Sequence, residues 1–331
     1  MKLKKEYLIL LLIIAALSAY LFTRSLNRTH YQLPEISRLD PGKINRIEIS
    51  RSAASIVLKK KEDRWYLDPP GYLADANRVE DMLKVFETLS LSALVSEAKD
   101  YGRYDLDAEK RISVRAWLDD ALQRSFDIGK TAPSFRHTFV RLEGDDRVFH
   151  ASDNFRSKFD LTADSLRDKN VLAFKVADIQ EIQITADQAS LKLIRSEVPV
   201  GTEASPPEKS DTAPAAAVKY EWKSSDGKEG NDPNISRLLT ILSSLKCADY
   251  INDRRKDSFS APIYVVKLKG TLHYRLDIFA RLQKDAENYP ALSSASNDPF
   301  FLSESQVRQI MMDPAEFLEK EGSKKKETDF N

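Results

Sequence analysis

The sequence predicts an α+β protein in which a single apolar N-terminal helix precedes two tandem repeated units. Each unit is expected to be a mostly antiparallel sheet with one long amphipathic helix on a face. Three observations predict this: an uncharged apolar stretch opens the chain, short runs of alternating apolar residues recur along it, and one order of elements occurs twice. Alternation of this kind is typical of a sheet with one buried face.

Composition and charge indicate a globular protein and argue against nucleic-acid binding. The 331 residues suffice for about two domains, and a hydrophobic content of 42% supplies ample core material. Basic and acidic residues both number 51, so the formal net charge is zero. Binding to phosphates needs clustered positive charge. We therefore expect no nucleic-acid partner.

The N-terminal segment predicts a membrane anchor. Residues 1–6 contain three lysines and are expected to be cytoplasmic, and residues 7–23 form the predicted transmembrane helix. As a helix, the apolar stretch 7–22 would be roughly 24 Å long, a little less than the roughly 30 Å of membrane hydrocarbon. Arg24 and Arg28 follow it, and the lysines on the other side favour a cytoplasmic N-terminus.

A cleaved signal peptide is the alternative to an anchor. Ala16, Leu17 and Ser18 form a small–x–small triplet of the kind found at cleavage sites. The apolar run continues to Phe22, which favours an uncleaved helix. Both interpretations export the remainder, so we expect a single-pass protein of the bacterial inner membrane with a periplasmic or other extracytoplasmic bulk. Residues 24–36 are expected to form a tether.

Residues 37–165 are predicted to form the first α+β unit. A helix begins at Asp75 or Asn77, either of which can cap it, and a short helix is predicted near residues 153–159. The apolar positions of the first helix follow a one-face spacing: Val79, Met82, Leu83, Phe86 and Leu89. Strands are predicted at residues 44–49, 54–60, 64–67, 112–118, 124–128, 138–142 and 147–150.

Residues 166–312 are predicted to repeat this order as a second unit. Its helix is expected to be capped by Asp232, with Pro233 in the first turn. The predicted correspondences are Ile47 with Ile182, Trp65 with Trp222, Asn77 with Asn234, Ile112 with Ile263, and Asp127 with Asp277.

Two segments are predicted to lie outside the cores. Residues 198–218 form an insertion rich in Pro, Ala, Ser and Glu, a composition that predicts a disordered loop between the second and third strands of the second unit. Residues 313–331 are expected to form a charged tail that begins with one helical turn after Pro314.

The sequence offers little catalytic chemistry. Cys247 is the only cysteine, which rules out an intramolecular disulfide and a cysteine-rich metal site. No phosphate-cradling or nucleophile-elbow motif occurs. His137 and His150 flank one hairpin and can face each other, so a metal or acid–base role is the alternative to ordinary strand histidines. We expect no enzymatic activity, no cofactor and no metal; an unrecognised hydrolase would involve these two histidines.

Two further sets of residues invite functional interpretations. Arg167, Asp168 and Lys169, at the predicted junction of the two units, are candidate partner contacts; the alternative is a surface turn capped by Asp168. Trp65 and Trp222, at equivalent places in the two units, are either a shared ligand platform or core packing.

With the repeat laid out, the chain resembles the family catalogued as domain of unknown function 4340. The resemblance rests on residues 64–67 with Pro70, Ala74 and Asp75, on residues 166–172 leading to Ile179 and Ile182, and on the order of elements. It implies an envelope protein associated with ABC-type transport or gliding-motility components, and it implies no catalytic residues. The long insertion departs from the family pattern.

These observations predict a non-catalytic, membrane-anchored extracytoplasmic scaffold or auxiliary subunit. The resemblance implies an ABC-type transport or motility-related envelope complex, with a permease component as the partner. The alternative is an extracytoplasmic module that binds a glycan or another small ligand.

Overall fold

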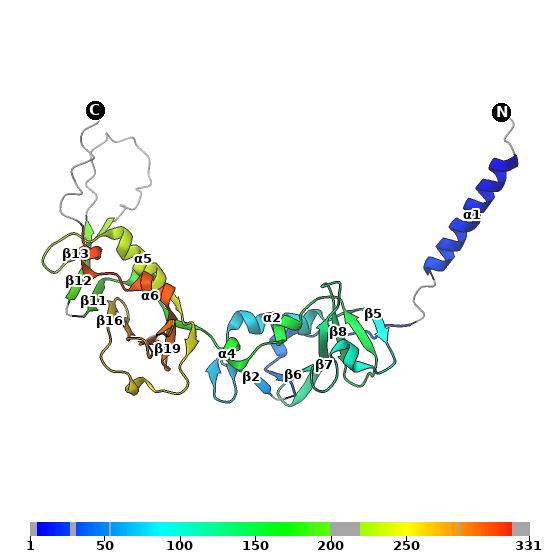
Figure 1. Cartoon of the computed structure of the whole chain (residues 1–331), viewed down its shortest axis with the longest axis horizontal. Helices are drawn as coiled ribbons and strands as arrows, with labels where there is room; N and C mark the ends of the chain where they lie inside the picture. The colour runs from blue at the N-terminus through cyan, green and yellow to red at the C-terminus, as the bar shows by residue number, and fades with distance from the viewer. Residues whose placement is uncertain are drawn as a thin grey trace, which may run out of the picture. The chain divides into compact units, whose positions relative to one another are not determined.

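The chain folds into two compact units, each with one large sheet (Figure 1). In this computed structural model the described residues are 5–26, 31–52, 54–187, 189–198, 219–283 and 285–319. The first unit is Met1–Asp168 and the second is Lys169–Asn331, so the boundary lies three residues beyond the predicted one at 165. All strand pairs among the described residues are antiparallel. The predicted α+β class is confirmed.

Helix α1, Lys5–Leu26, forms where the sequence predicts an apolar helix. Side chains are described for its residues 9–21, and nine large apolar ones among them are 50–70% exposed. Counting described side chains alone, no helix is long and apolar enough to cross a membrane. The membrane anchor therefore stays a prediction.

The first unit is built on a nine-stranded sheet with the order β4-β3-β2-β1-β6-β7-β8-β9-β5. The predicted strands all form, and the sequence analysis missed β4 and β5. Strand β5 pairs with β9 through two register shifts, which removes the regular alternation that reveals a strand. The strands are β1 (Arg46–Ser50), β2 (Ser55–Lys61), β3 (Arg64–Leu67), β4 (Tyr72–Leu73), β5 (Leu91–Ser96), β6 (Ile112–Leu118), β7 (Ala121–Thr131), β8 (Thr138–Leu142) and β9 (Val148–Ala151).

Helix α2, Ala76–Thr88, lies across one face of this sheet (Figure 1). The Asp75 carboxylate accepts hydrogen bonds from the backbone N–H groups of Asn77 and Arg78, which confirms Asp75 as the cap. The buried stripe of α2 includes Val79, Met82 and Phe86, as the spacing predicts.

Four phenylalanines fill the core beneath α2. Phe86 on α2 contacts Phe126 on β7 and Phe159, and Phe155 contacts Phe126 and Phe159. The ring centroids of the contacting pairs lie 5.7–6.5 Å apart in edge-to-face arrangements. Phe159 is the last residue of the short helix α3, Arg156–Phe159, which forms within the predicted range 153–159. Helix α4, Ala163–Leu166, closes the unit and buries Leu166.

The opposite face of β8 and β9 carries a second, smaller core. Val140 and Phe149 belong to the main core, whereas their strand neighbours Phe139 and Val148 pack with Leu106 and Ala132. Adjacent strand residues point to opposite faces. The prediction of a sheet buried on one side is therefore wrong for this part of the unit, because a segment that includes the 3₁₀ helix η2 (Tyr101–Tyr104) packs against it.

The second unit has an eight-stranded sheet with the order β13-β12-β11-β16-β17-β18-β19-β15. Apart from β4, this order follows that of the first sheet strand for strand. Its strands are β11 (Glu181–Ala186), β12 (Ala189–Val198), β13 (Lys219–Ser224), β15 (Asp249–Tyr250), β16 (Tyr264–Lys269), β17 (His273–Ile278), β18 (Asn288–Ser293) and β19 (Phe300–Ser303), and a separate pair joins β10 (Asn170–Ala173) to β14 (Ser244–Lys246). Its helices are α5 (Asp232–Leu242) and α6 (Glu304–Ile310).

Two details of the predicted correspondence need correction. The cap of α5 is Asn231, whose side chain accepts from the backbone N–H of Asn234 at 3.1 Å; Asp232 lies one residue later, within the first turn. The cap moves by one residue because both side chains are short hydrogen-bond acceptors.

The second correction concerns the partner of Ile112 in the other sheet. Ile112 pairs with Ile128, whereas Ile278 pairs with Tyr264, so Tyr264 rather than Ile263 holds the corresponding place. Tyr264 is 1% exposed, and its hydroxyl donates to the carbonyl of Met312 at 3.0 Å.

The second unit extends beyond the predicted boundary at residue 312. The predicted turn forms as the 3₁₀ helix η5, Pro314–Phe317, and Phe317 is fully buried in the main core of this unit. The predicted insertion connects the paired strands β12 and β13, but its residues 199–218 lie outside the described residues, as does the tail from residue 320.

Candidate functional site

The three junction residues do not form one exposed surface. Arg167 is 4% exposed, and its guanidinium carbon lies 3.5 Å from the ring centroid of Tyr72. The Lys169 ammonium lies 2.6 Å from a carboxylate oxygen of Asp249. The boundary between the units falls between Asp168 and Lys169. Arg167 has almost no surface to offer a partner, so only Asp168 and Lys169 remain candidate contacts.

The two tryptophans favour the packing interpretation. Trp65 on β3 and Trp222 on β13 are each 8% exposed and belong to the main core of their own unit. A platform for a ligand needs an exposed ring face, which neither provides.

His137 and His150 face each other, as their places beside one hairpin allow. Their rings stack with centroids 5.4 Å apart and planes 12° apart, and the His137 Nδ1 atom lies 3.0 Å from the carbonyl oxygen of Ala151. Burial, and secondarily the neighbouring His137, lower the pKa of His150. Within the described residues no group of three or more potential ligands is arranged to hold a metal ion.

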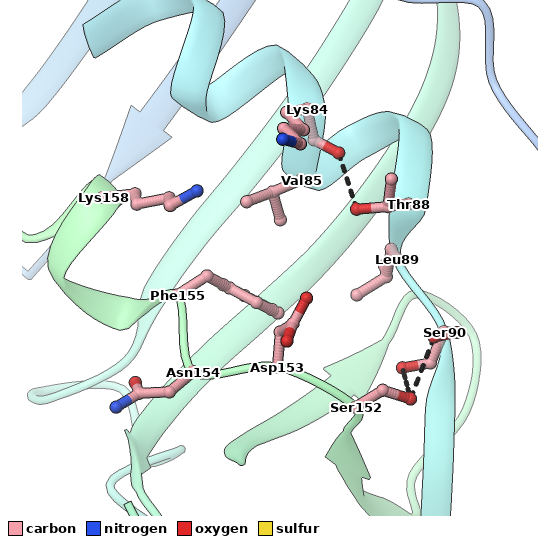
Figure 2. Close-up of a pocket in the computed structure, with 10 residues that line it drawn as sticks. All are labelled: Lys84, Val85, Thr88, Leu89, Ser90, Ser152, Asp153, Asn154, Phe155 and Lys158. Carbon is pink, nitrogen blue, oxygen red and sulfur yellow. Dashed lines mark hydrogen bonds between the residues drawn. The ribbon is translucent and has the colours of Figure 1, made fainter. Parts of the chain in front are cut away.

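A cavity of about 280 Å³ lies between the C-terminal end of α2 and the segment that joins β9 to α3. Figure 2 shows Lys84 and Thr88 on α2 on one side, with Asp153 and Phe155 on the other. Sequence reasoning missed this site because its walls come from segments about 70 residues apart. The only local signal is the polar run Ser152–Asn154 directly after a strand, which by itself indicates a loop.

Hydroxyl, amide, ammonium and carboxylate groups share this cavity. The Ser90 hydroxyl donates to Ser152 Oγ at 2.9 Å, and the Lys158 ammonium donates to Asp81 Oδ1 at 3.2 Å. Lys84 and Asp153 form no ion pair with any described residue. A site with donors and acceptors of both charges beside the buried ring of Phe155 can hold a small polar ligand such as a sugar.

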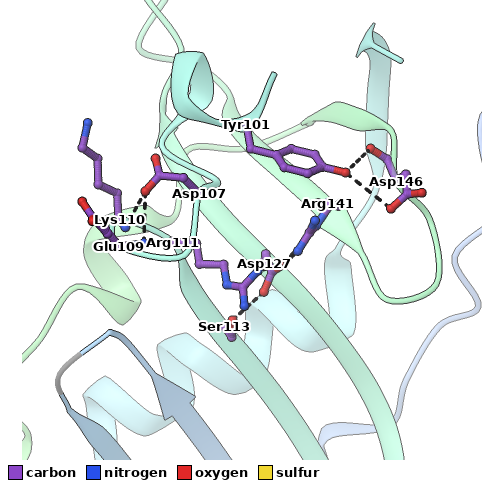
Figure 3. A network of polar contacts seen from close by, with 9 residues as sticks. All are labelled: Tyr101, Asp107, Glu109, Lys110, Arg111, Ser113, Asp127, Arg141 and Asp146. Carbon is purple, nitrogen blue, oxygen red and sulfur yellow. Dashed lines mark hydrogen bonds and ion pairs between the residues drawn. The ribbon is translucent and has the colours of Figure 1, made fainter. Parts of the chain in front are cut away.

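A second polar cluster surrounds Asp127 on the face of the first sheet that points away from α2 (Figure 3). The Asp127 carboxylate accepts from the Ser113 hydroxyl at 2.5 Å and from Nη2 of Arg141 at 2.6 Å. The Arg111 guanidinium lies 3.8 Å away. The charge of Asp127 is thus balanced by Arg141, and its carboxylate is hydrogen-bonded, which indicates that it links strands β6, β7 and β8 structurally.

The Asp127 cluster continues to the loop between β8 and β9. Arg141 lies over the ring of Tyr101, with its guanidinium carbon 4.6 Å from the centroid, and the Tyr101 hydroxyl donates to the carbonyl of Asp146 at 3.0 Å. Lys99 donates to the Asp146 carboxylate and lowers the pKa of that group. The cluster fixes the segment that covers this face of the sheet.

The fold therefore defines an α+β protein with two mainly antiparallel sheets, each covered by one long helix. The family described as Domain of unknown function (DUF4340) matches residues 65–262, more than half of the chain and parts of both units. The chain belongs to this family. No curated protein and no solved structure matches it.

Proposed function

We propose that the chain is a membrane-anchored extracytoplasmic scaffold, an auxiliary subunit of an ABC-type transport or motility-related envelope complex, without catalysis of its own. The observation that carries the proposal is the surface of α1, where nine large apolar side chains are 50–70% exposed. Transfer of such surface from water to hydrocarbon is favourable by about 25 cal/mol per Å².

Charge supports one orientation of this anchor. Three lysines precede the apolar stretch, and Arg24 and Arg28 follow it. An excess of basic residues stays in the cytoplasm. We infer that α1 is a single pass in the bacterial inner membrane and that both units lie outside the cytoplasm.

The matched strand orders support a scaffold of two tandem copies. The first sheet contains the order β3-β2-β1-β6-β7-β8-β9-β5. The second sheet has the matching order β13-β12-β11-β16-β17-β18-β19-β15. A repeated unit offers a partner two similar but distinct surfaces. The resemblance to envelope proteins that accompany ABC-type components supports a permease component as that partner.

The anchor is tested by placing charge in α1. Leu11→Lys combined with Ile14→Lys should release the full-length protein from membranes washed with urea at neutral pH, where lysine is charged, because each charged lysine near a helix centre costs about 2.5–3.5 kcal/mol in hydrocarbon. Leu272→Lys is the matched control, since Leu272 is 62% exposed but lies in the second unit. Release of the unaltered protein under the same conditions would contradict an anchor.

The partner is tested by crosslinking and mass spectrometry on the full-length protein in native membranes. The expected result is a transporter permease whose crosslinks gather on one face of the units. Recovery of this chain alone would contradict the scaffold role.

A second candidate, a module that binds a glycan or another small ligand, is supported by the cavity beside α2. Lys84 and Asp153 line it without an ion pair among the described residues, and hydroxyls of Ser90 and Ser152 stand beside them. Soluble peptidoglycan fragments should raise the melting temperature of the first unit, and Asp153→Ala should abolish the shift. Absence of a shift with the unaltered protein would set this candidate aside.

A further inference from the structure

The loop between β7 and β8, residues 132–137, presents an exposed aromatic side chain. Phe135 in this loop is 79% exposed, more than any other large apolar side chain among the described residues. An exposed phenylalanine has no favourable interaction with water, and aromatic side chains are enriched at the centres of protein interfaces.

The backbone of this loop holds Phe135 in one direction. Phe135 has a φ of 58°, in the left-handed region that is unfavourable for a non-glycine residue. The Ala132 N–H donates to the carbonyl of His137, and the Phe135 N–H donates to the carbonyl of Ala132, both at 2.8 Å. These two bonds close a tight turn with Phe135 at its exposed end.

Asn154 braces the loop from outside it. Its Nδ2 donates to the Phe135 carbonyl at 3.1 Å, and its Oδ1 accepts from the Thr131 hydroxyl at 3.1 Å. Ala132, at the base of the loop, is 2% exposed and packs into the small core with Phe139. The aromatic side chain is therefore presented by a pre-organised backbone, which lowers the entropy lost on binding.

Two basic residues stand close to Phe135 in the sequence. Lys130 and Arg136 are both exposed, and neither forms an ion pair with any described residue. The corresponding loop of the second unit, between β17 and β18, differs: its Arg281 lies 3.3 Å from Glu304 and stacks on Tyr289. Its exposed apolar side chain, Leu282, is only 40% exposed.

We propose that residues 130–137, the last two residues of β7 and the loop that follows them, hereafter the Phe135 loop, dock onto an envelope protein whose surface has an apolar cavity bordered by carboxylates. This inference rests on the proposed scaffold function and names the surface that the partner contacts. The Phe135 ring fills the cavity, and Lys130 and Arg136 meet the carboxylates. A fixed backbone at Phe135, which sets the direction of its Cα–Cβ bond, favours a shaped protein cavity over a lipid surface, since fluid lipid does not need a defined direction.

The first test places a photo-crosslinking phenylalanine analogue at Phe135, or at Leu282 as the control, in the full-length protein in native membranes. The expected result is one protein crosslinked from position 135 and not from 282, at a site that has apolar residues within an acidic border. Crosslinks to lipid alone from position 135 would overturn the proposal in favour of a membrane contact.

The second test measures how much of that crosslinked protein co-purifies. Phe135→Ala should lower its apparent affinity about tenfold or more, and Leu282→Ala should leave it unchanged. Arg136→Glu should weaken binding, and reversal of an acidic residue at the mapped site of the partner should restore it. Unchanged melting temperatures show that these exposed substitutions leave the fold intact.

Failure of the inference and failure of the scaffold function give different results. If a permease is recovered with the unaltered protein and Phe135→Ala binds it equally well, the docking surface is wrong and the scaffold stands. If neither position 135 nor general crosslinking captures any protein besides this chain, both are wrong.

Discussion

The two sheets share a strand order but differ on the face turned away from α2 and α5. In the first sheet Phe139 pairs with His150, and at the corresponding register in the second sheet Pro290 pairs with Phe301. Phe139 belongs to a second small core, whereas most buried apolar residues described in the second unit gather into one main cluster, with Ile251 and Phe279 outside it. The first unit thus carries an additional layer.

This difference indicates where new contacts can develop in such a fold. The helix-covered face is constrained by packing in both units, as the equally buried Trp65 and Trp222 show. On the opposite face or at its rim the first unit has its histidine pair, the Asp127 cluster and the Phe135 loop. These features of the first unit therefore lie on the face where the two units differ.

The largest expected effect comes from removing matched core side chains. Phe126 and Leu276 hold corresponding places, opposite Val114 and Val266, and each is 1% exposed. Phe126→Ala should lower the free energy of unfolding of the first unit by about 3–5 kcal/mol, and Leu276→Ala that of the second by about 2–5 kcal/mol. Hydrogen exchange with mass spectrometry on the full chain reports each unit separately.

The result also tests whether the units are independent. Protection should fall only in the unit that carries the substitution, because each core is formed within one unit. Equal loss of protection in both units after Phe126→Ala would show that they unfold together.

A smaller difference in stability is expected between Asp127 and Asp277, the corresponding aspartates on the sheet faces turned away from α2 and α5. Asp127 is paired with Arg141, both under 20% exposed, and also accepts from Ser113. Its counterpart Asp277 is paired with Arg275, which is 51% exposed. Asp127→Asn should therefore cost about 1–3 kcal/mol, and Asp277→Asn no more than about 1 kcal/mol. Urea unfolding of each variant, followed by exchange in each unit, measures the two costs; equal costs would remove this distinction.

Local sequence patterns predicted the elements that local physics determines. The strand of residues 64–67, the cap at Asp75 and the facing of His137 and His150 all depend on residues close together in the chain. The strand β5 was missed because its register shifts interrupt alternation.

The candidate cavity could not be predicted in the same way. Lys84 and Lys158 line one cavity although they lie on different helices, and only tertiary packing brings these helices together. The burial of Arg167 was missed for a similar reason, since a charged residue is buried only when a partner such as the Tyr72 ring covers it.

The capping residues of α2 and α5 allow a matched comparison, in which the expected effects on stability are modest. Asp75 accepts from two backbone N–H groups at the start of α2, and Asn231 accepts from one at the start of α5. Asp75→Ala and Asn231→Ala should each cost about 1 kcal/mol, the former somewhat more. The substitutions Asp75→Asn and Asn231→Asp, which swap the two capping residue types, should leave the melting temperature nearly unchanged. A large loss of stability in either variant would show that the side chain does more than cap its helix.

The smallest expected effect is a pH dependence confined to the first unit. Burial lowers the pKa of His150, so the unfolded chain takes up a proton at higher pH than the folded one. Stability of the first unit should therefore fall as the pH drops below about 6.5, the ordinary histidine value, and level off below the folded pKa. Phe301 stands at the register of the second sheet that corresponds to His150 in the first, so His150→Phe introduces the residue of the second unit. This variant should remove the pH dependence of the first unit. The control His273→Phe, at an exposed position in the second unit, should leave that dependence in place. Hydrogen exchange of the full chain, measured between pH 7 and pH 5, tests this prediction. If the first unit of His150→Phe kept its pH dependence, His150 would not be its cause.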